Sequence, residues 1–327
     1  MARPSVFLRG CFPYEKKRRF AMKNTTLLAF LVIFAIMTGC TQVESRSIVD
    51  KNGGVEKTVV VTIDQGMAPP GSEPQKPSDV VQFVGEGWSV QTKTEQTRMI
   101  LSATKKLAPG AMSGGGITLM SKGKKLVTLT PATEVSESGV TYRETLKWVG
   151  ESRQSELNEG MANAQKQIAS ALKSYNPKPD EIDAIAKEAT LELWRIVYGP
   201  SDPIFPIFLT QPIKGEREMK IKLYEFFAKR FEEKPLGAMK AEDAKTAARQ
   251  IVRQLTSQEL MQGSATEADP GQAQDRELIS ISISVTGPGE VMKHNGNYDP
   301  VEDRLTWDMF SDAAAHQEIS LSATFKN

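Results

Sequence analysis

The chain of 327 residues carries 41 basic and 40 acidic side chains, which gives a net charge of +1. This near balance argues against the strongly basic surfaces by which proteins bind nucleic acid. The length allows about two domains at the usual 100–200 residues each. The only cysteines are Cys11 and Cys40, so a chain that began at Cys40 would have no second thiol for a disulfide.

The first predicted element is an apolar run, Leu27–Met37, which a short Thr-Gly-Cys sequence ending at Cys40 follows. A helix that crosses a bilayer needs about 20 apolar residues, so this run is too short to span one. Its length and the small residues after it are typical of a secretory signal peptide rather than of a buried core helix. We therefore predict a signal peptide over 1–39, with Met22 as an alternative start and ordinary secretion favoured over the twin-arginine route.

The ending Met37-Thr38-Gly39-Cys40 resembles the lipobox of bacterial lipoproteins. The resemblance implies that Cys40 is lipidated and becomes the first residue of the mature protein. Two or three acyl chains, palmitate among them, would then anchor the protein, because one chain alone binds membranes only marginally. The expected location is the cell envelope, on the outer membrane if the organism is diderm, since Thr41 is not the aspartate linked to inner-membrane retention.

Residues 40–56 are polar and contain glycine, so we expect a lipidated N-terminus followed by a flexible tether. Strand signal begins with the β-branched residues of Lys57–Asp64. After a proline-rich loop, Ser78 is expected to cap a short helix over Asp79–Val84. Alternating apolar and polar residues then predict antiparallel strands with one solvated face, at Trp88–Val90, Arg98–Thr104, Ile117–Met120, Lys125–Thr130 and Val140–Val149.

At Glu151 the apolar period changes from two residues to 3.6, which predicts amphipathic helices. Apolar stripes indicate four of them, the first from Leu157 to Leu172, the second from Asp180 to Val197, the third from Met219 to Arg230 and the fourth from Ala241 to Met261. Helices in this order can form an antiparallel bundle, so we predict a helical insertion over 151–262.

A polar linker is expected over 263–277, and strand signal returns in the alternating segment Leu278–Val285. Asn295-Gly296 is a strong signal for a two-residue hairpin turn. The strands that follow are too few to fold alone, so we expect them to pair with the earlier ones. The predicted fold class is α+β, an antiparallel β-rich domain (57–150 plus 278–327) with a four-helix insertion.

Two pieces of the chain resemble bacterial LppM-type lipoproteins. One is the run Val80–Leu107, which contains Gly87-Trp88-Ser89-Val90. The other is Pro288-Gly289-Glu290-Val291, with Asn295-Gly296 and Leu305-Thr306-Trp307 downstream. The resemblance covers about half of the mature chain and implies an α+β envelope domain without known catalysis. The helical segment and the lack of a membrane span after Phe325 depart from that family.

No catalytic motif stands out. A serine hydrolase needs a histidine base, and both histidines, His294 and His316, lie in polar connecting segments where we expect solvent. Zinc would need three or four cysteine or histidine ligands. A group of acidic residues offers oxygens suited to calcium, but its spacing matches no EF-hand, and we interpret it as a solvated loop (Asp299, Glu302, Asp303 and Asp308). The sequence therefore predicts no catalytic residue, no metal and no cofactor.

Two groups of apolar residues are candidate binding sites. Trp88, Trp148 and Trp307 lie on predicted strands, where they either pack in the core or line an apolar pocket. The second group lies in a proline-rich loop between the second and third helices, and either contacts a partner or membrane or packs beneath the bundle (Ile204, Phe205, Ile207, Phe208 and Leu209).

These features predict a lipid-anchored envelope lipoprotein with a non-catalytic binding or assembly role. Its expected partners are the membrane, through the acyl anchor on Cys40, and an envelope protein. The alternative is a carrier of lipid or another apolar ligand in a pocket between the sheet and the helices.

Overall fold

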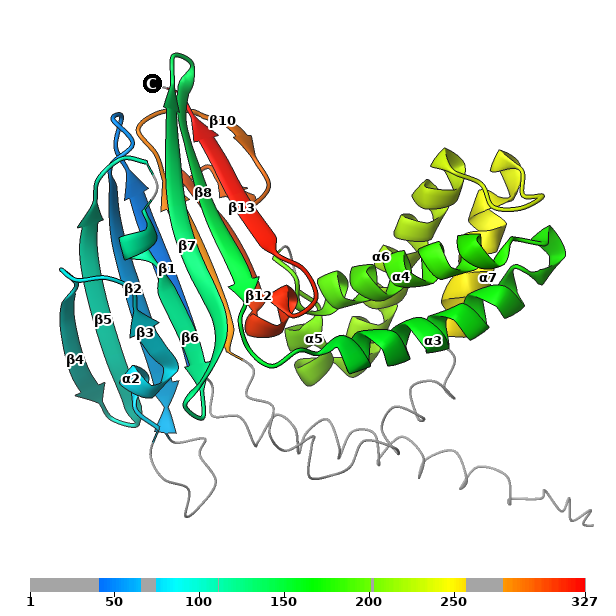
Figure 1. Ribbon diagram of the computed structural model, residues 1–327, viewed down its shortest axis with the longest axis horizontal. Coiled ribbons are helices and arrows are strands. Elements are labelled where there is room, and N and C mark those ends of the chain that lie inside the picture. The colour runs from blue at the N-terminus through cyan, green and yellow to red at the C-terminus, as the bar shows by residue number, and fades with distance from the viewer. Residues whose placement is uncertain (1–40, 66–74, 111, 201–202, 257–278, 327) are drawn as a thin grey trace, which may run out of the picture.

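The computed structural model describes residues 41–65, 75–110, 112–200, 203–256 and 279–326 (Figure 1). The predicted signal peptide, Cys40 and the predicted linker 263–277 lie outside these ranges. The α+β prediction is confirmed, because the described residues form two antiparallel-rich sheets and a set of helices.

In the described part of the chain, seven strands form the first sheet, in the order β11-β12-β9-β1-β2-β5-β4. Their bounds are β1 Thr41–Val49, β2 Val55–Asp64, β4 Ser89–Glu95, β5 Arg98–Leu107, β9 Ser280–Thr286, β11 Asn297–Asp299 and β12 Arg304–Phe310. All neighbours are antiparallel except β1 and β9, which run parallel. The first strand of the chain thus lies between β2 and a strand that follows the helices.

The second sheet has six strands within the described ranges, in the order β10-β13-β8-β7-β6-β3. Its strands are β3 Val81–Phe83, β6 Ile117–Ser121, β7 Lys124–Ser136, β8 Gly139–Trp148, β10 Val291–His294 and β13 Ile319–Phe325. As predicted, a strand from the C-terminal segment pairs with one from before residue 150, since β13 lies against β8. The helices are therefore inserted into a single β-rich unit.

The two sheets pack face to face as a sandwich with one continuous core (Figure 1). Alternation explains the burial, because inward residues recur at every second position of a strand. In β2, for example, Val59, Val61 and Ile63 are buried and their neighbours are half-buried. In β9 the predicted inward residues Ile281, Ile283 and Val285 are all at most 1% exposed.

The predicted tether over 40–56 is wrong, because Thr41–Val49 forms strand β1 with strict alternation of buried residues. It pairs with β2 through all nine of its residues, and a turn at Lys51 and Asn52 connects the two strands. β1 also pairs with β9 from Gln42 to Ile48. Within the described ranges the sandwich therefore begins at Thr41, their first residue.

The predicted helix over Asp79–Val84 is also largely wrong. Helix α2 spans only Pro77–Val80, and the chain continues at once into strand β3. Proline at the first helical position and the Asp79 side chain, which accepts from the backbone of Lys76, support this single turn. The β-branched pair Val80-Val81 is then buried, so tertiary packing favours the strand.

Asn295-Gly296 does not close a hairpin, because β10 and β11 on its two sides belong to different sheets. The Asn295 amide bonds to both sheets and stabilises this crossing. Its Oδ1 accepts from the Ser322 backbone at 2.9 Å and from Nε1 of Trp307 at 3.1 Å. Its Nδ2 donates to the Ser320 carbonyl at 2.8 Å. The asparagine acts here as a link between layers rather than as a turn residue.

The helices between β8 and β9 form an arm that projects from one side of the sandwich (Figure 1). They are α3 Gln154–Ala171, α4 Pro179–Tyr198, α5 Phe205–Thr210, α6 Pro212–Glu233 and α7 Ala244–Leu255. The arm has its own apolar core, which is separate from the core of the sandwich. Alanines of α7 (Ala244, Ala247 and Ala248) are 0% exposed, and their small side chains let the neighbouring helices approach closely.

No helix among the described residues is long and apolar enough to span a membrane.

Candidate functional site

The three predicted pocket tryptophans do not converge. Trp88 precedes β4 and Trp307 lies on β12, and five strand spacings, about 24 Å, separate those strands in the sheet. Trp307 is 0% exposed and belongs to the core. Trp88 packs on Phe83, with ring centroids 4.7 Å apart. Trp148 packs against the Arg153 guanidinium at 4.6 Å. The three rings thus pack with separate neighbours.

The proline-rich segment is not an extended tip, because Phe205–Thr210 forms helix α5. Ile204 is 0% exposed and belongs to the core of the arm, so it is not available to a partner. Phe205 packs between Tyr198 of α4 and Phe310 of β12, with centroids 5.6 and 5.1 Å from its own. The segment therefore packs between the arm and the sandwich, which corrects the predicted contact role for Ile204 and Phe205.

Two further residues of this segment are half-buried. Phe208 packs on the arm's core and against Gly215 of α6. A Cβ atom added to Gly215 would lie 2.9 Å from Cγ of Phe208. A glycine inside α6 is thus explained by the close approach of α5. Ile207 lines a cavity of about 490 Å³ between the arm and the sandwich. Pro203, Pro206 and four polar side chains also line it (Lys214, Glu218, Lys222 and Asp308). The fifth predicted residue is Leu209, whose side chain is not among those that the structure describes.

The other polar candidates have local roles. Asp299 accepts from the backbone nitrogens of Val301 and Glu302, at 2.9 and 3.2 Å, which is ordinary turn geometry. Tyr298 donates to Asp303 at 2.7 Å, and this bond raises the pKa of the tyrosine. His316, expected in solvent, instead packs edge-on against Trp194, with centroids 4.4 Å apart.

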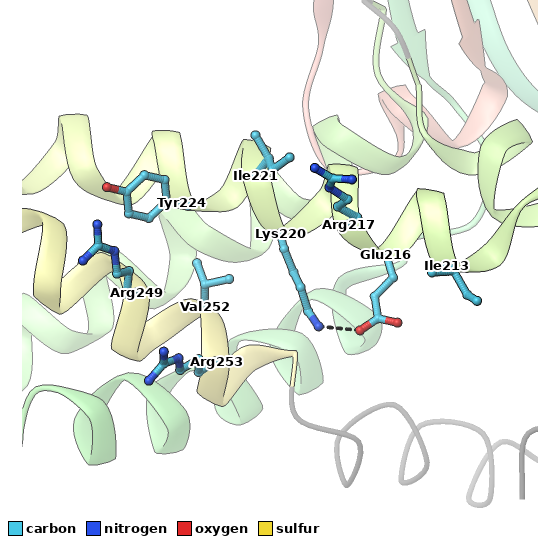
Figure 2. Close-up of a pocket in the computed structure, with 9 residues that line it drawn as sticks. All are labelled: Ile213, Glu216, Arg217, Lys220, Ile221, Tyr224, Arg249, Val252 and Arg253. Atoms are coloured by element: carbon cyan, nitrogen blue, oxygen red, sulfur yellow. Dashed lines mark hydrogen bonds and ion pairs between the residues drawn. The ribbon is translucent and has the colours of Figure 1, made fainter.

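A groove of about 700 Å³ lies between helices α6 and α7, and we take it as the candidate site (Figure 2). The helical period explains its lining, since residues three or four apart share one face of a helix. From α6 come Ile213, Glu216, Arg217, Lys220, Ile221 and Tyr224, and from α7 come Arg249, Val252 and Arg253. These side chains stand beside the faces by which the two helices pack together.

The groove is strongly cationic. Four basic side chains line it against one carboxylate, that of Glu216, which pairs with Lys220 one turn away (Figure 2). Within the described ranges no acidic side chain forms an ion pair with Arg217, Arg249 or Arg253. The Arg249 guanidinium lies 5.9 Å from the ring centre of Tyr224, a contact that orients it without neutralising its charge. Three guanidinium groups are therefore available to an anionic ligand.

Exposed apolar surface accompanies this charge. Ile213 is 86% exposed and Ile221 is 45% exposed, whereas Val252 on the groove floor is 7% exposed. Arginine is the side chain best suited to recognise carboxylate or phosphate, because its planar fork can donate two parallel hydrogen bonds. The groove can hold an anionic ligand that also carries apolar groups. Its lining includes no histidine, cysteine or serine that could serve as base or nucleophile.

The sequence patterns do not reveal this groove. The α6 stripe that it uses mixes isoleucine, arginine, lysine and tyrosine, so it does not stand out as an apolar face. The apolar stripe of Met219, Leu223 and Phe227 packs in the core of the arm. Ile213 and Ile221 lie outside that stripe, and this is the sequence signal that could have indicated a second apolar surface on α6.

Comparison of the chain with protein-family models, with curated proteins and with solved structures finds no match.

Proposed function

We propose that this protein is a lipid-anchored lipoprotein of the bacterial cell envelope, and that its arm binds an acidic, partly apolar segment of an envelope protein. The observation that carries the binding role is the α6–α7 groove, in which Arg217, Arg249 and Arg253 have no acidic partner among the described residues. A groove between two helices suits an inserted helix or extended segment, which presents side chains at regular intervals. The binding role needs no catalytic group.

The anchor rests on the short apolar run and on Cys40, which resembles a lipidated cysteine. Because β1 starts at Thr41, an acylated Cys40 would hold this end of the sandwich directly at the bilayer surface. The start of β9 lies at the same end of the sandwich as Thr41, because β1 and β9 run parallel with Gln42 opposite Ser280. A protein held this closely would have little freedom to reach distant partners, which fits assembly with neighbours in the same membrane.

The anchor is tested by Cys40→Ser. We expect this variant to leave the membrane fraction or to accumulate with its leader attached, whereas the parent chain carries acyl groups that mass spectrometry detects. A Cys40→Ser protein that stays firmly in the membrane with an uncut N-terminus would show that Leu27–Met37 is a true anchor helix.

The binding role is tested by photo-crosslinking in cells. A photoreactive amino acid at Ile221 should give a discrete adduct with a protein, and Arg217→Glu, Arg249→Glu and Arg253→Glu together should abolish it. The matched control reverses three exposed cations elsewhere on the arm, Lys166→Glu, Lys173→Glu and Lys187→Glu, and should preserve the adduct.

The same probe distinguishes the other outcomes. An adduct with lipid, together with binding of the purified chain to vesicles of anionic phospholipid, would replace the protein partner with the membrane surface. No adduct at Ile221 above the level seen with the probe at Lys166 would remove the binding role of the groove.

A further inference from the structure

Four polar side chains meet in the centre of the sandwich, between its two sheets. Lys57 of β2 forms an ion pair with Glu144 of β8, and both side chains are 0% exposed. Tyr142, also on β8, donates a hydrogen bond of 2.5 Å to Oε2 of Glu144. Its hydroxyl oxygen lies 2.9 Å from Oγ of Ser47 on β1. Because the tyrosine proton is directed to Glu144, the serine is the donor in this second bond.

The setting is apolar. On the same face of β2, Val55 and Val59 flank Lys57 and are 3% and 0% exposed. A buried ion pair contributes little net stability, since the cost of taking two ions out of water offsets their attraction. The ion pair as such therefore does not explain why a lysine and a glutamate occupy the core of the sandwich.

We propose that Lys57 and Glu144 condense to an amide, an intramolecular isopeptide bond that joins the two sheets covalently. The reactive groups are already in contact, since Nζ of Lys57 bonds to Oε1 of Glu144, and attack requires an amine within about 3–3.5 Å of the carboxyl carbon. The product is neutral, so its formation removes both charges from the core. Exclusion of water also protects the amide from hydrolysis.

The reaction balances without any further reagent. A proton passes from the Lys57 ammonium to Oε1 of Glu144, which leaves a neutral amine and a neutral acid. The Nζ lone pair attacks Cδ, and the C=O electron pair moves to Oε2. A second proton then passes from nitrogen to Oε1, the Cδ–Oε1 bond breaks and water leaves. Nζ retains one proton and Oε2 becomes the amide carbonyl oxygen.

Tyr142 is the catalytic residue in this scheme. It donates to Oε2, the oxygen on which negative charge develops in the tetrahedral intermediate, as an oxyanion donor must. Burial, together with the charge and hydrogen bond of Glu144, holds the pKa of Tyr142 well above its usual value, so the hydroxyl keeps its proton. Ser47 fixes the orientation of the ring hydroxyl from the opposite sheet.

The bond would serve a chain that has no disulfide between its sheets. Cys11 and Cys40 are the only cysteines, and both precede β1. Lys57 and Glu144 are 87 residues apart in sequence, so a link between them closes a long loop and restricts the unfolded chain. We expect the linked protein to melt at a clearly higher temperature than an unlinked variant.

Peptide mapping of the detergent-extracted, denatured full chain tests the proposal. Trypsin cannot cleave after an acylated lysine, so the peptide that contains Lys57 should be joined to the fragment Glu144–Lys147. Its mass should be lower than the sum of the two peptides by one water molecule. A digest of the folded wild-type protein that yields a peptide ending at Lys57 and free Glu144–Lys147 in full amount would overturn the proposal.

Two variants separate the chemistry from packing. Lys57→Met should give only free Glu144–Lys147, and if it does not fold, the wild-type map still decides the question. Tyr142→Phe should form the same linked peptide about 10²-fold more slowly in a pulse-chase experiment, the usual effect of losing one oxyanion donor. Linkage at an unchanged rate in Tyr142→Phe would contradict the role of the tyrosine.

Discussion

Arg153 and Asp312 join the helical arm to the sandwich through an ion pair between residues 159 positions apart. Arg153 directly precedes α3. Asp312 lies in the short 3-10 helix Ser311–Ala314, which follows β12. The Asp312 side chain is 2% exposed and that of Arg153 is 16% exposed. Trp194 of α4 adds a hydrogen bond of 2.6 Å to the Asp312 carbonyl. Charge and an aromatic side chain together hold the base of the arm.

Asp312→Asn should therefore destabilise the protein markedly. Removing one partner of a buried ion pair leaves the other charge unsatisfied and typically costs about 3–5 kcal/mol. The melting temperature measures the effect. The control is Glu151→Gln, which breaks the exposed pair with Lys124, whose side chains are 83% and 71% exposed, and should leave the melting temperature unchanged. Equal effects of the two substitutions would contradict the structural role of Asp312.

Phe205→Asp combined with Phe208→Asp should lower the melting temperature sharply. Phe205 packs between Tyr198 and Phe310, and Phe208 packs on Gly215, so both carboxylates would enter apolar contacts. Burial of an unpaired charge lowers the free energy of unfolding by several kcal/mol, which is among the largest effects that single substitutions have on stability.

The control for this pair is Ile213→Asp, at a side chain that is 86% exposed, which should leave the melting temperature unchanged. A stable Phe205→Asp/Phe208→Asp protein would mean that α5 can detach from between the arm and the sandwich, and would favour the alternative in which this segment contacts a partner or membrane.

Local patterns predicted most elements but not all of their partners. The alternation of Ile281, Ile283 and Val285 identified β9 because its inward residues are apolar. β1 escaped detection because two of its inward positions are Ser45 and Ser47, which are 0% and 2% exposed. Ser47 is buried because Tyr142 supplies a hydrogen-bond partner from the other sheet. No local signal in β1 reveals that partner.

The turn signal at Asn295-Gly296 failed for a related reason. The dipeptide is favourable in a tight turn, but the Asn295 side chain bonds to Trp307 in one sheet and to the backbone of β13 in the other. Contacts with distant residues thus determine where the chain goes. The groove escaped notice because its residues come from two helices, and only the packing of α6 on α7 brings Arg217 and Arg249 to one surface.

The stability of the protein should fall as the pH rises above about 10. Burial, the largest cause, raises the pKa of Tyr142 in the folded state, so the folded protein holds this proton more tightly than the unfolded chain does. Above the unfolded pKa the unfolded chain loses the proton while the folded chain keeps it, so each rise in pH favours unfolding. The contribution is fully present below about pH 10 and is lost above it.

Chemical denaturation at several pH values measures this slope. Tyr142→Phe should be less stable at neutral pH, because Glu144 loses a donor, but its stability should decline less steeply at alkaline pH than that of the parent. Tyr298→Phe is the comparison, since the hydrogen bond to Asp303 raises the pKa of this surface tyrosine less than burial raises that of Tyr142, and its loss should flatten the slope less. Parallel curves for the parent and Tyr142→Phe would show that Tyr142 does not titrate differently in the two states.

Removal of the arm should leave a folded sandwich. The two cores are separate, and strands from both sides of the insertion pair within the same sheets. Deletion of residues 152–263 with a flexible bridge removes Arg153 together with the arm, and the same deletion opens Asp312 to water, so no unpaired charge stays buried. Circular dichroism should show strand signal with little helix, and unfolding should remain cooperative with a smaller denaturant slope, since less surface is exposed. An aggregated or non-cooperative product would show that the sandwich depends on Tyr198 and Phe205 to cover Phe310.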